Sequence, residues 1–108
     1  MNTASSLPSL TPEQRREALR KAHEVRSKRR AFKDRIESGE QGIAGAIALG
    51  RSDEDLAGIK TLDLLRSLPG VGSRTAEAIM AELGIAPSRR LRGLGEHQVA
   101  SLVERLST

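Results

Sequence analysis

The apolar residues in the first third of the chain recur at intervals of three, four or seven positions, as on one face of a helix. They are Leu19, Ala22, Val25, Phe32 and Ile36. Thr11, Pro12 and Gln14 form a start signal, because threonine caps the first turn, proline fits its first position and glutamine completes a capping box. Ser38 and Gly39 form a stop signal. The sequence therefore predicts a long basic helix over residues 11–38, roughly 40 Å in length, with only its second half well anchored.

Shorter apolar runs with the same helical spacing continue to the C-terminus. We expect helices over residues 43–49, 54–57, 61–68, 73–83 and 95–106. Gly42 and Gly50 border the first of these helices, and Thr61 and Ser73 are the expected N-caps of the third and fourth. Because no run alternates with a period of two residues, the predicted fold is all-α.

Composition restricts both the core and the cellular setting. Phe32 is the only aromatic residue and cysteine is absent, so we expect an aliphatic core without disulfides. No stretch approaches the ~20 apolar residues of a membrane span. Residues 1–10 lack the basic start and apolar run of a signal peptide. We expect a disordered tail over residues 1–10 and a cytoplasmic protein that does not bind membranes.

Positive charge is concentrated in the predicted long helix. Ten of the 18 lysine and arginine residues lie between Thr11 and Arg35, although the formal net charge is only +4. This asymmetry favours a polyanionic partner over the alternative of a merely solvated helix face. A membrane-surface helix is disfavoured by the lack of tryptophan and of a bulky apolar face. The candidate nucleic-acid contacts here are Arg15, Arg16, Arg20, Lys28 and Arg29.

A Pro- and Gly-containing segment between two predicted helices carries the most specific signal. Its candidate contacts are Pro69, Gly70, Val71, Gly72, Ser73 and Arg74. The glycines permit positive φ and close approach to a ligand, and a helix begins directly afterwards. Free backbone amides at a helix N-terminus favour an anion, so we expect phosphate contact here. The alternative is an ordinary tight turn between helices. The string resembles the helix-hairpin-helix motif of nonspecific DNA-binding proteins.

A second signal is a short basic loop over residues 86–95, in which Arg89, Arg90 and Arg92 are the candidate contacts. Arginine keeps its charge and holds phosphate in bidentate fashion. We expect Leu91 and Leu94 to anchor the loop to the core and so direct the arginines outward. The alternative is that nearby glutamates pair with the arginines. Elsewhere, the isolated histidines predict no metal site and no cofactor.

With these residues in hand, the chain resembles the actinobacterial type of integration host factor over nearly all of its length. The resemblance is carried by residues 7–15, by residues 68–76 and above all by the string over residues 85–95. It implies a long N-terminal helix followed by a helix-two-turns-helix DNA-binding domain over residues 39–108. It places the hairpin and the arginine loop at double-stranded DNA.

The same resemblance implies a nucleoid-associated monomer of low sequence specificity that bends or compacts DNA. It also implies support for site-specific recombination and gene regulation, with a phage integrase as a partner at recombination sites. On this interpretation the protein is cytoplasmic, in the nucleoid, and is not an enzyme.

Three alternatives remain open at this point. Base-excision glycosylases carry a similar hairpin, but Arg74 occupies the position of their nucleophilic lysine, and no aspartate follows Asp63. An RNA-binding, ribosome-associated protein would use the same pair of helices. A plain interaction module would bind neither nucleic acid.

Overall fold

The computed structural model describes residues 9–107, in which short turns and loops connect helices. Its elements are α1 (Pro12–Glu37), α2 (Ile43–Ser52), α3 (Glu54–Ala57), α4 (Thr61–Ser67), α5 (Ser73–Glu82), the 3₁₀ turn η2 (Leu91–Gly93) and α6 (Glu96–Leu106). Between residues 9 and 107 there is no strand, only an isolated antiparallel bridge between Lys60 and Arg90. The expected all-α fold is confirmed. The tail expected to be disordered lies mostly outside the described residues.

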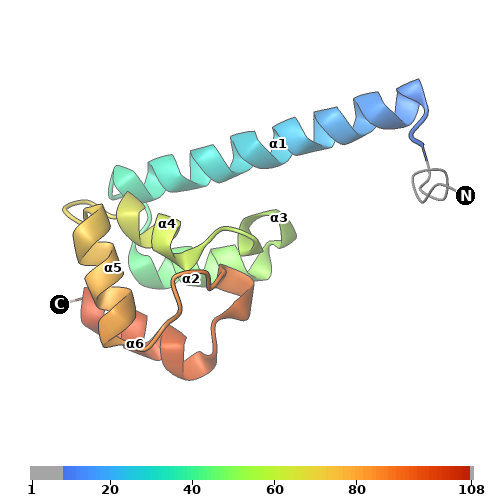
Figure 1. The fold of residues 1–108 in the computed structure, drawn as a ribbon. Coiled ribbons are helices and arrows are strands. Elements are labelled where there is room, and N and C mark those ends of the chain that lie inside the picture. Colours follow the sequence, from blue (N-terminus) through green and yellow to red (C-terminus); the bar gives the residue numbers. More distant parts are fainter. Residues whose placement is uncertain (1–8, 108) are drawn as a thin grey trace, which may run out of the picture.

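Helix α1 extends well beyond the body formed by the other helices, which gives the molecule an elongated shape of 57 × 31 × 24 Å (Figure 1). It begins with the expected capping box, in which the Gln14 amide donates to Thr11 Oγ1 at 3.1 Å and the Thr11 amide donates to Gln14 Oε1 at 2.9 Å. It ends at Glu37 with Ser38 as its C-cap, after which Gly39 adopts a φ of 83°. The helix predicted from the sequence is therefore confirmed.

Only the second half of α1 is anchored by apolar burial. Phe32 and Ile36 are fully buried, whereas Leu19 on the same stripe remains 64% exposed. The free-standing half of the helix is instead covered by charged side chains. This agrees with the expectation that its N-terminal half contributes little to the core.

The core is aliphatic except for Phe32, and it draws on every helix of the body. Its fully buried members include Ile47, Leu64, Leu65, Ile79, Met80, Leu91 and Leu102. Leu91 belongs to η2, so the arginine loop contributes directly to the core. The expected burial of Leu91 and Leu94 is confirmed.

Three details of the helix boundaries differ from expectation. Gly50 does not border α2 but lies inside it, because the helix continues to Ser52. A Cβ atom on Gly50 would lie 2.5 Å from Leu91 Cδ1, so the absence of a side chain lets α2 pack against η2. The N-caps of α4 and α5 are Lys60 and Gly72, each one residue before the expected threonine and serine.

We predict that Leu91→Ala lowers the free energy of unfolding by about 2–5 kcal/mol, because it leaves a cavity in a close-packed core. Urea unfolding followed by far-UV circular dichroism measures this loss, since the chain has no tryptophan or tyrosine. Leu19→Ala is the matched control, because it removes the same atoms from an exposed position. Equal losses in the two variants would contradict the burial of Leu91.

Candidate nucleic-acid interface

The hairpin between α4 and α5 is a tight turn whose shape depends on one glycine. Gly70 has a φ of 78°, a conformation that side chains with a Cβ rarely adopt. The amide of Val71 donates to the carbonyl oxygen of Leu68 at 3.1 Å and closes the turn. Val71 itself is half-buried and packs against the core. The turn is thus fixed before any ligand arrives.

The N-terminus of α5 keeps its backbone donors free. Its cap, Gly72, has a φ of −86° and no side chain that could accept a hydrogen bond from the first turn. In the part of the chain between residues 9 and 107, the amides of Gly72, Ser73 and Arg74 have no hydrogen-bond acceptor. The first turn also contains no acidic residue. Because a helix N-terminus carries partial positive charge, this arrangement suits an anion.

The arginine loop is held to the body by its backbone. The amide of Leu91 donates to the carbonyl oxygen of Ile59 at 3.0 Å, and the amide of Thr61 donates to that of Arg89 at 2.9 Å. These bonds and the burial of Leu91 and Leu94 fix the loop against the segment between α3 and α4. The guanidiniums therefore project from a rigid support.

No carboxylate neutralises the three arginines within the described residues. Arg89 and Arg90 donate to the carbonyl oxygens of Gly93 and Gly58, and Arg92 has no hydrogen bond or ion pair there. Bonds to neutral carbonyl groups orient a guanidinium without cancelling its charge. The alternative in which nearby glutamates pair with this loop is not what the structure shows, because Glu82 pairs with Arg105 instead.

The candidates on the free half of α1 are partly engaged with acids on the same helix. Arg16 pairs with Glu13, and Arg20 pairs with Glu17 and Glu24. All of these side chains are more than half exposed, so the pairs are weak and can exchange with phosphate. The two other candidates on this helix, Lys28 and Arg29, contact α3 instead.

Lys28 and Arg29 attach α1 to α3. The Lys28 ammonium lies 2.7 Å from Asp53 Oδ2 and 3.3 Å from Asp55 Oδ2, and Arg29 Nε donates to the carbonyl oxygen of Asp55 at 2.8 Å. Lys21 also approaches Asp55, at 3.6 Å. These contacts set the direction in which α1 leaves the body. A nucleic-acid role for Lys28 stays a prediction, and it would require exchange of these partners.

Asp53 both caps α3 and forms an ion pair with Lys28. Its Oδ1 accepts hydrogen bonds from the amides of Asp55 and Leu56 and so caps α3. The hydrogen bond from Lys28, followed by those from the backbone amides, lowers the pKa of Asp53 despite partial burial. In turn, Asp53 raises the pKa of Lys28. The ion pair therefore forms across the whole neutral pH range.

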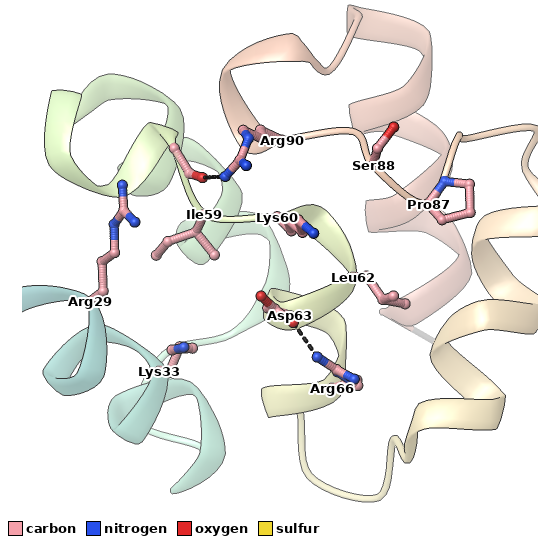
Figure 2. Close-up of a pocket in the computed structure, with 11 residues that line it drawn as sticks. Arg29, Lys33, Ile59, Lys60, Leu62, Asp63, Arg66, Pro87, Ser88 and Arg90 are labelled. Carbon is pink, nitrogen blue, oxygen red and sulfur yellow. Dashed lines mark hydrogen bonds and ion pairs between the residues drawn. The ribbon is translucent and has the colours of Figure 1, made fainter. Parts of the chain in front are cut away.

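A basic hollow of about 560 Å³ lies between α1, α4 and the segment before η2 (Figure 2). Its cationic side chains are Arg29, Lys33, Lys60, Arg66 and Arg90. Lys33, Lys60 and Arg66 were not among the candidates from the sequence. They come from separate segments that only the fold brings together, so no local pattern indicates them.

Within residues 9–107, no group of three or more histidine, cysteine or acidic residues could hold a metal ion. No helix in the same range is long and apolar enough to cross a membrane. His23 and His97 are both exposed and lie far apart in the sequence.

A tight hairpin between α4 and α5, followed by a basic loop pinned to the same body, defines a small all-helical protein of helix-two-turns-helix class. Residues 36–106 match the family described as S13-like H2TH domain. The chain is 45% identical over 103 residues to the integration host factor of Mycobacterium tuberculosis, a match that covers 95% of this chain and 98% of the relative.

A second relative and a solved structure indicate the same family. The integration host factor of Streptomyces coelicolor is 45% identical over 97 residues, which cover 90% of this chain and 91% of the relative. A solved structure of sIHF bound to an 8-bp palindromic DNA superposes with a TM-score of 0.78 at 39% identity, over 81% of this chain and 98% of that chain. The chain belongs to the integration host factor family with an S13-like H2TH domain, which confirms the resemblance found in its sequence.

We predict that Lys28→Met raises the pKa of Asp53 toward its ordinary value of 3.8, because it removes the largest cause of the lowered pKa. Titration of the carboxyl carbon by NMR measures the change. The stabilisation from the pair is complete above pH 3.8 and is lost as the pH falls through the lowered pKa of Asp53. The difference in unfolding free energy between wild type and Lys28→Met should therefore shrink in that range.

Lys21→Met is the control for this titration, because Lys21 approaches Asp55 and not Asp53. It should leave the pKa of Asp53 close to its wild-type value. An unchanged Asp53 pKa in Lys28→Met would show that the pair does not form in solution.

Proposed function

We propose that this protein is a nucleoid-associated protein that binds double-stranded DNA with low sequence specificity and bends or compacts it. The observation that carries the proposal is the set of unneutralised donors at two fixed places. These are the free amides at the N-terminus of α5 and the guanidiniums of the arginine loop. The fold match to a DNA-bound relative and the integration host factor relatives support the same conclusion.

The mechanism is electrostatic and geometric. The α5 N-terminus receives one phosphate through Gly72, Ser73 and Arg74, with Gly70 allowing the close approach. The arginine loop receives further phosphates through bidentate hydrogen bonds. Phosphate contacts position a protein on DNA but carry no sequence information directly. Since no asparagine or glutamine stands beside the loop arginines, bidentate reading of adenine is not expected there.

The proposal extends to the biological setting. We infer a monomer that acts in the nucleoid of the cytoplasm, supports site-specific recombination and gene regulation, and has a phage integrase as a partner at recombination sites. We also infer that it has no catalytic activity of its own. Arg74 stands where a glycosylase of similar hairpin sequence has its lysine, and a guanidinium does not act as an amine nucleophile.

The RNA-binding alternative is not favoured. The relatives that match over most of the chain are integration host factors, and the matching solved structure contains DNA. Competition between duplex DNA and a structured RNA for the same protein separates the two functions directly.

We predict that affinity for unrelated duplexes falls steeply with salt. If the protein neutralises roughly 5–8 phosphates, log affinity against log salt has a slope of about −5 to −7. Fluorescence anisotropy with labelled duplexes of different sequence measures both the slope and the sequence preference. A slope close to zero, or tight binding to a single consensus alone, would contradict the proposal.

Arg92→Ala tests the contribution of the loop without disturbing its support, because Arg92 has no partner among the described residues. It should weaken binding to all duplexes alike and make the slope less steep by about one unit. Helical content by circular dichroism should stay unchanged. A variant that binds as well as the parent would remove Arg92 from the interface.

A further inference from the structure

The region between the two surfaces of the proposed function is hollowed along α4. Two hollows adjoin along the side of α4, with volumes of about 560 and 730 Å³. The residues that line both are Lys33, Asp63 and Arg66. From there the first hollow extends to Ser88 and Arg90 at the arginine loop, and the second extends to Pro69 and Gly70 at the hairpin. We call the joined hollows the basic groove.

The lining of the basic groove is positively charged. Its cations are Arg29, Lys33, Lys60, Arg66 and Arg90. Its carboxylates are Asp63 and Glu37, and Asp63 already pairs with Arg66 (Figure 2). Like charges held together repel one another, so the free protein bears an electrostatic cost that an anion in the groove would relieve. The groove therefore favours a ligand with several closely spaced negative charges.

The side-chain ammonium groups of Lys33 and Lys60 have no partner among the described residues. They line the groove from different elements, Lys33 from α1 and Lys60 from the start of α4 (Figure 2). Among the residues between positions 9 and 107, neither side-chain ammonium has a hydrogen-bond or ion-pair partner, although the backbone carbonyl of Lys60 accepts from the amides of Asp63 and Leu64. Lys28, only five residues before Lys33, is by contrast engaged by two carboxylates. A lysine ammonium binds phosphate as a compact charge with three donors.

The arginines of the groove are already oriented. Arg29 donates to the carbonyl oxygen of Asp55 and Arg90 donates to that of Gly58, so each keeps its charge and its remaining N–H donors. Two fixed guanidiniums and two free ammoniums thus surround the same space. This combination suits a phosphate chain that passes through the groove.

We propose that the basic groove holds consecutive phosphates of one DNA strand, with Lys33 and Lys60 as contacts beyond those of the hairpin and the arginine loop. The proposal rests on the proposed function and defines the path of the DNA. A DNA strand that contacts both the hairpin and the arginine loop would pass along the groove between them. Closely spaced phosphates could also come from a free polyphosphate, so the experiment separates these two sources.

The test compares Lys33→Gln, Lys60→Gln and the double variant with the parent in a salt series on labelled duplexes. Each single variant should make the slope of log affinity against log salt less steep by about 0.9, and the double variant by about twice that. At 0.15 M salt each lost contact should weaken binding about fivefold, which follows from the same slope. The loss should be equal for unrelated sequences.

Arg35→Gln is the matched control, because Arg35 is an exposed cation on α1 outside the groove lining. It removes the same unit charge only two residues after Lys33, and it should keep the parental slope. Lys60→Arg keeps the charge in the groove and should also keep the slope. Circular dichroism checks that all variants have the helical content of the parent.

Two results would overturn the groove as a DNA path. One is that both lysine variants keep the parental slope while Arg92→Ala loses affinity, which leaves the proposed function standing. The other is that the lysine variants lose binding of tripolyphosphate but not of DNA, which assigns the groove to a free polyphosphate. A parent protein without salt-dependent DNA binding would instead overturn the proposed function itself.

Discussion

Leu91 is buried against α2, and its amide donates to the carbonyl oxygen of Ile59. Through this one residue the arginine loop is both part of the core and part of the surface. The hydrophobic effect holds its backbone in place, and the side chains of Arg90 and Arg92 on either side of Leu91 are exposed. The backbone of the loop is therefore ordered before a ligand arrives, and carbonyl oxygens orient the side chains of Arg89 and Arg90. Such preorganisation lowers the ordering cost of binding, which is why we propose these three arginines as a site.

The cations of this protein fall into two groups that differ in their partners. Several of those on α1 are paired with carboxylates, as Arg20 and Lys28 are. The guanidiniums of the arginine loop are bonded to carbonyl oxygens or to nothing among the described residues, as Arg90 and Arg92 are. In the first group, Lys28 attaches α1 to the acidic residues Asp53 and Asp55 at α3. The second group keeps its full charge for a polyanion.

The sequence predicted the features that depend on neighbouring residues. The capping box of Thr11 and the hairpin at Gly70 are local devices, and both occur as expected. Gly50 was interpreted wrongly because the reason for it, the close approach of Leu91, lies 41 positions further along the chain. The N-caps at Lys60 and Gly72 shifted by one residue, which is the usual uncertainty of helix ends.

The candidate nucleic-acid interface could likewise be predicted only where its residues are neighbours in the sequence. The hairpin and the arginine loop are each contiguous strings, so their residues could be proposed from the sequence. The basic groove joins α1, α4 and the segment before η2, and no spacing of Lys33, Lys60 and Arg66 along the chain indicates it. The pairing of Lys28 with Asp53 also spans separate helices and could not be foreseen.

The central claim is that donors fixed by the fold receive the phosphates. The most direct measurement is an NMR titration of the ¹⁵N-labelled protein with a short duplex, which follows each backbone amide separately. The account predicts that the amides of Gly72, Ser73 and Arg74 shift most among the backbone signals of α5, because they donate directly to phosphate. If these amides stay unchanged while the protein binds the duplex, the claim is contradicted.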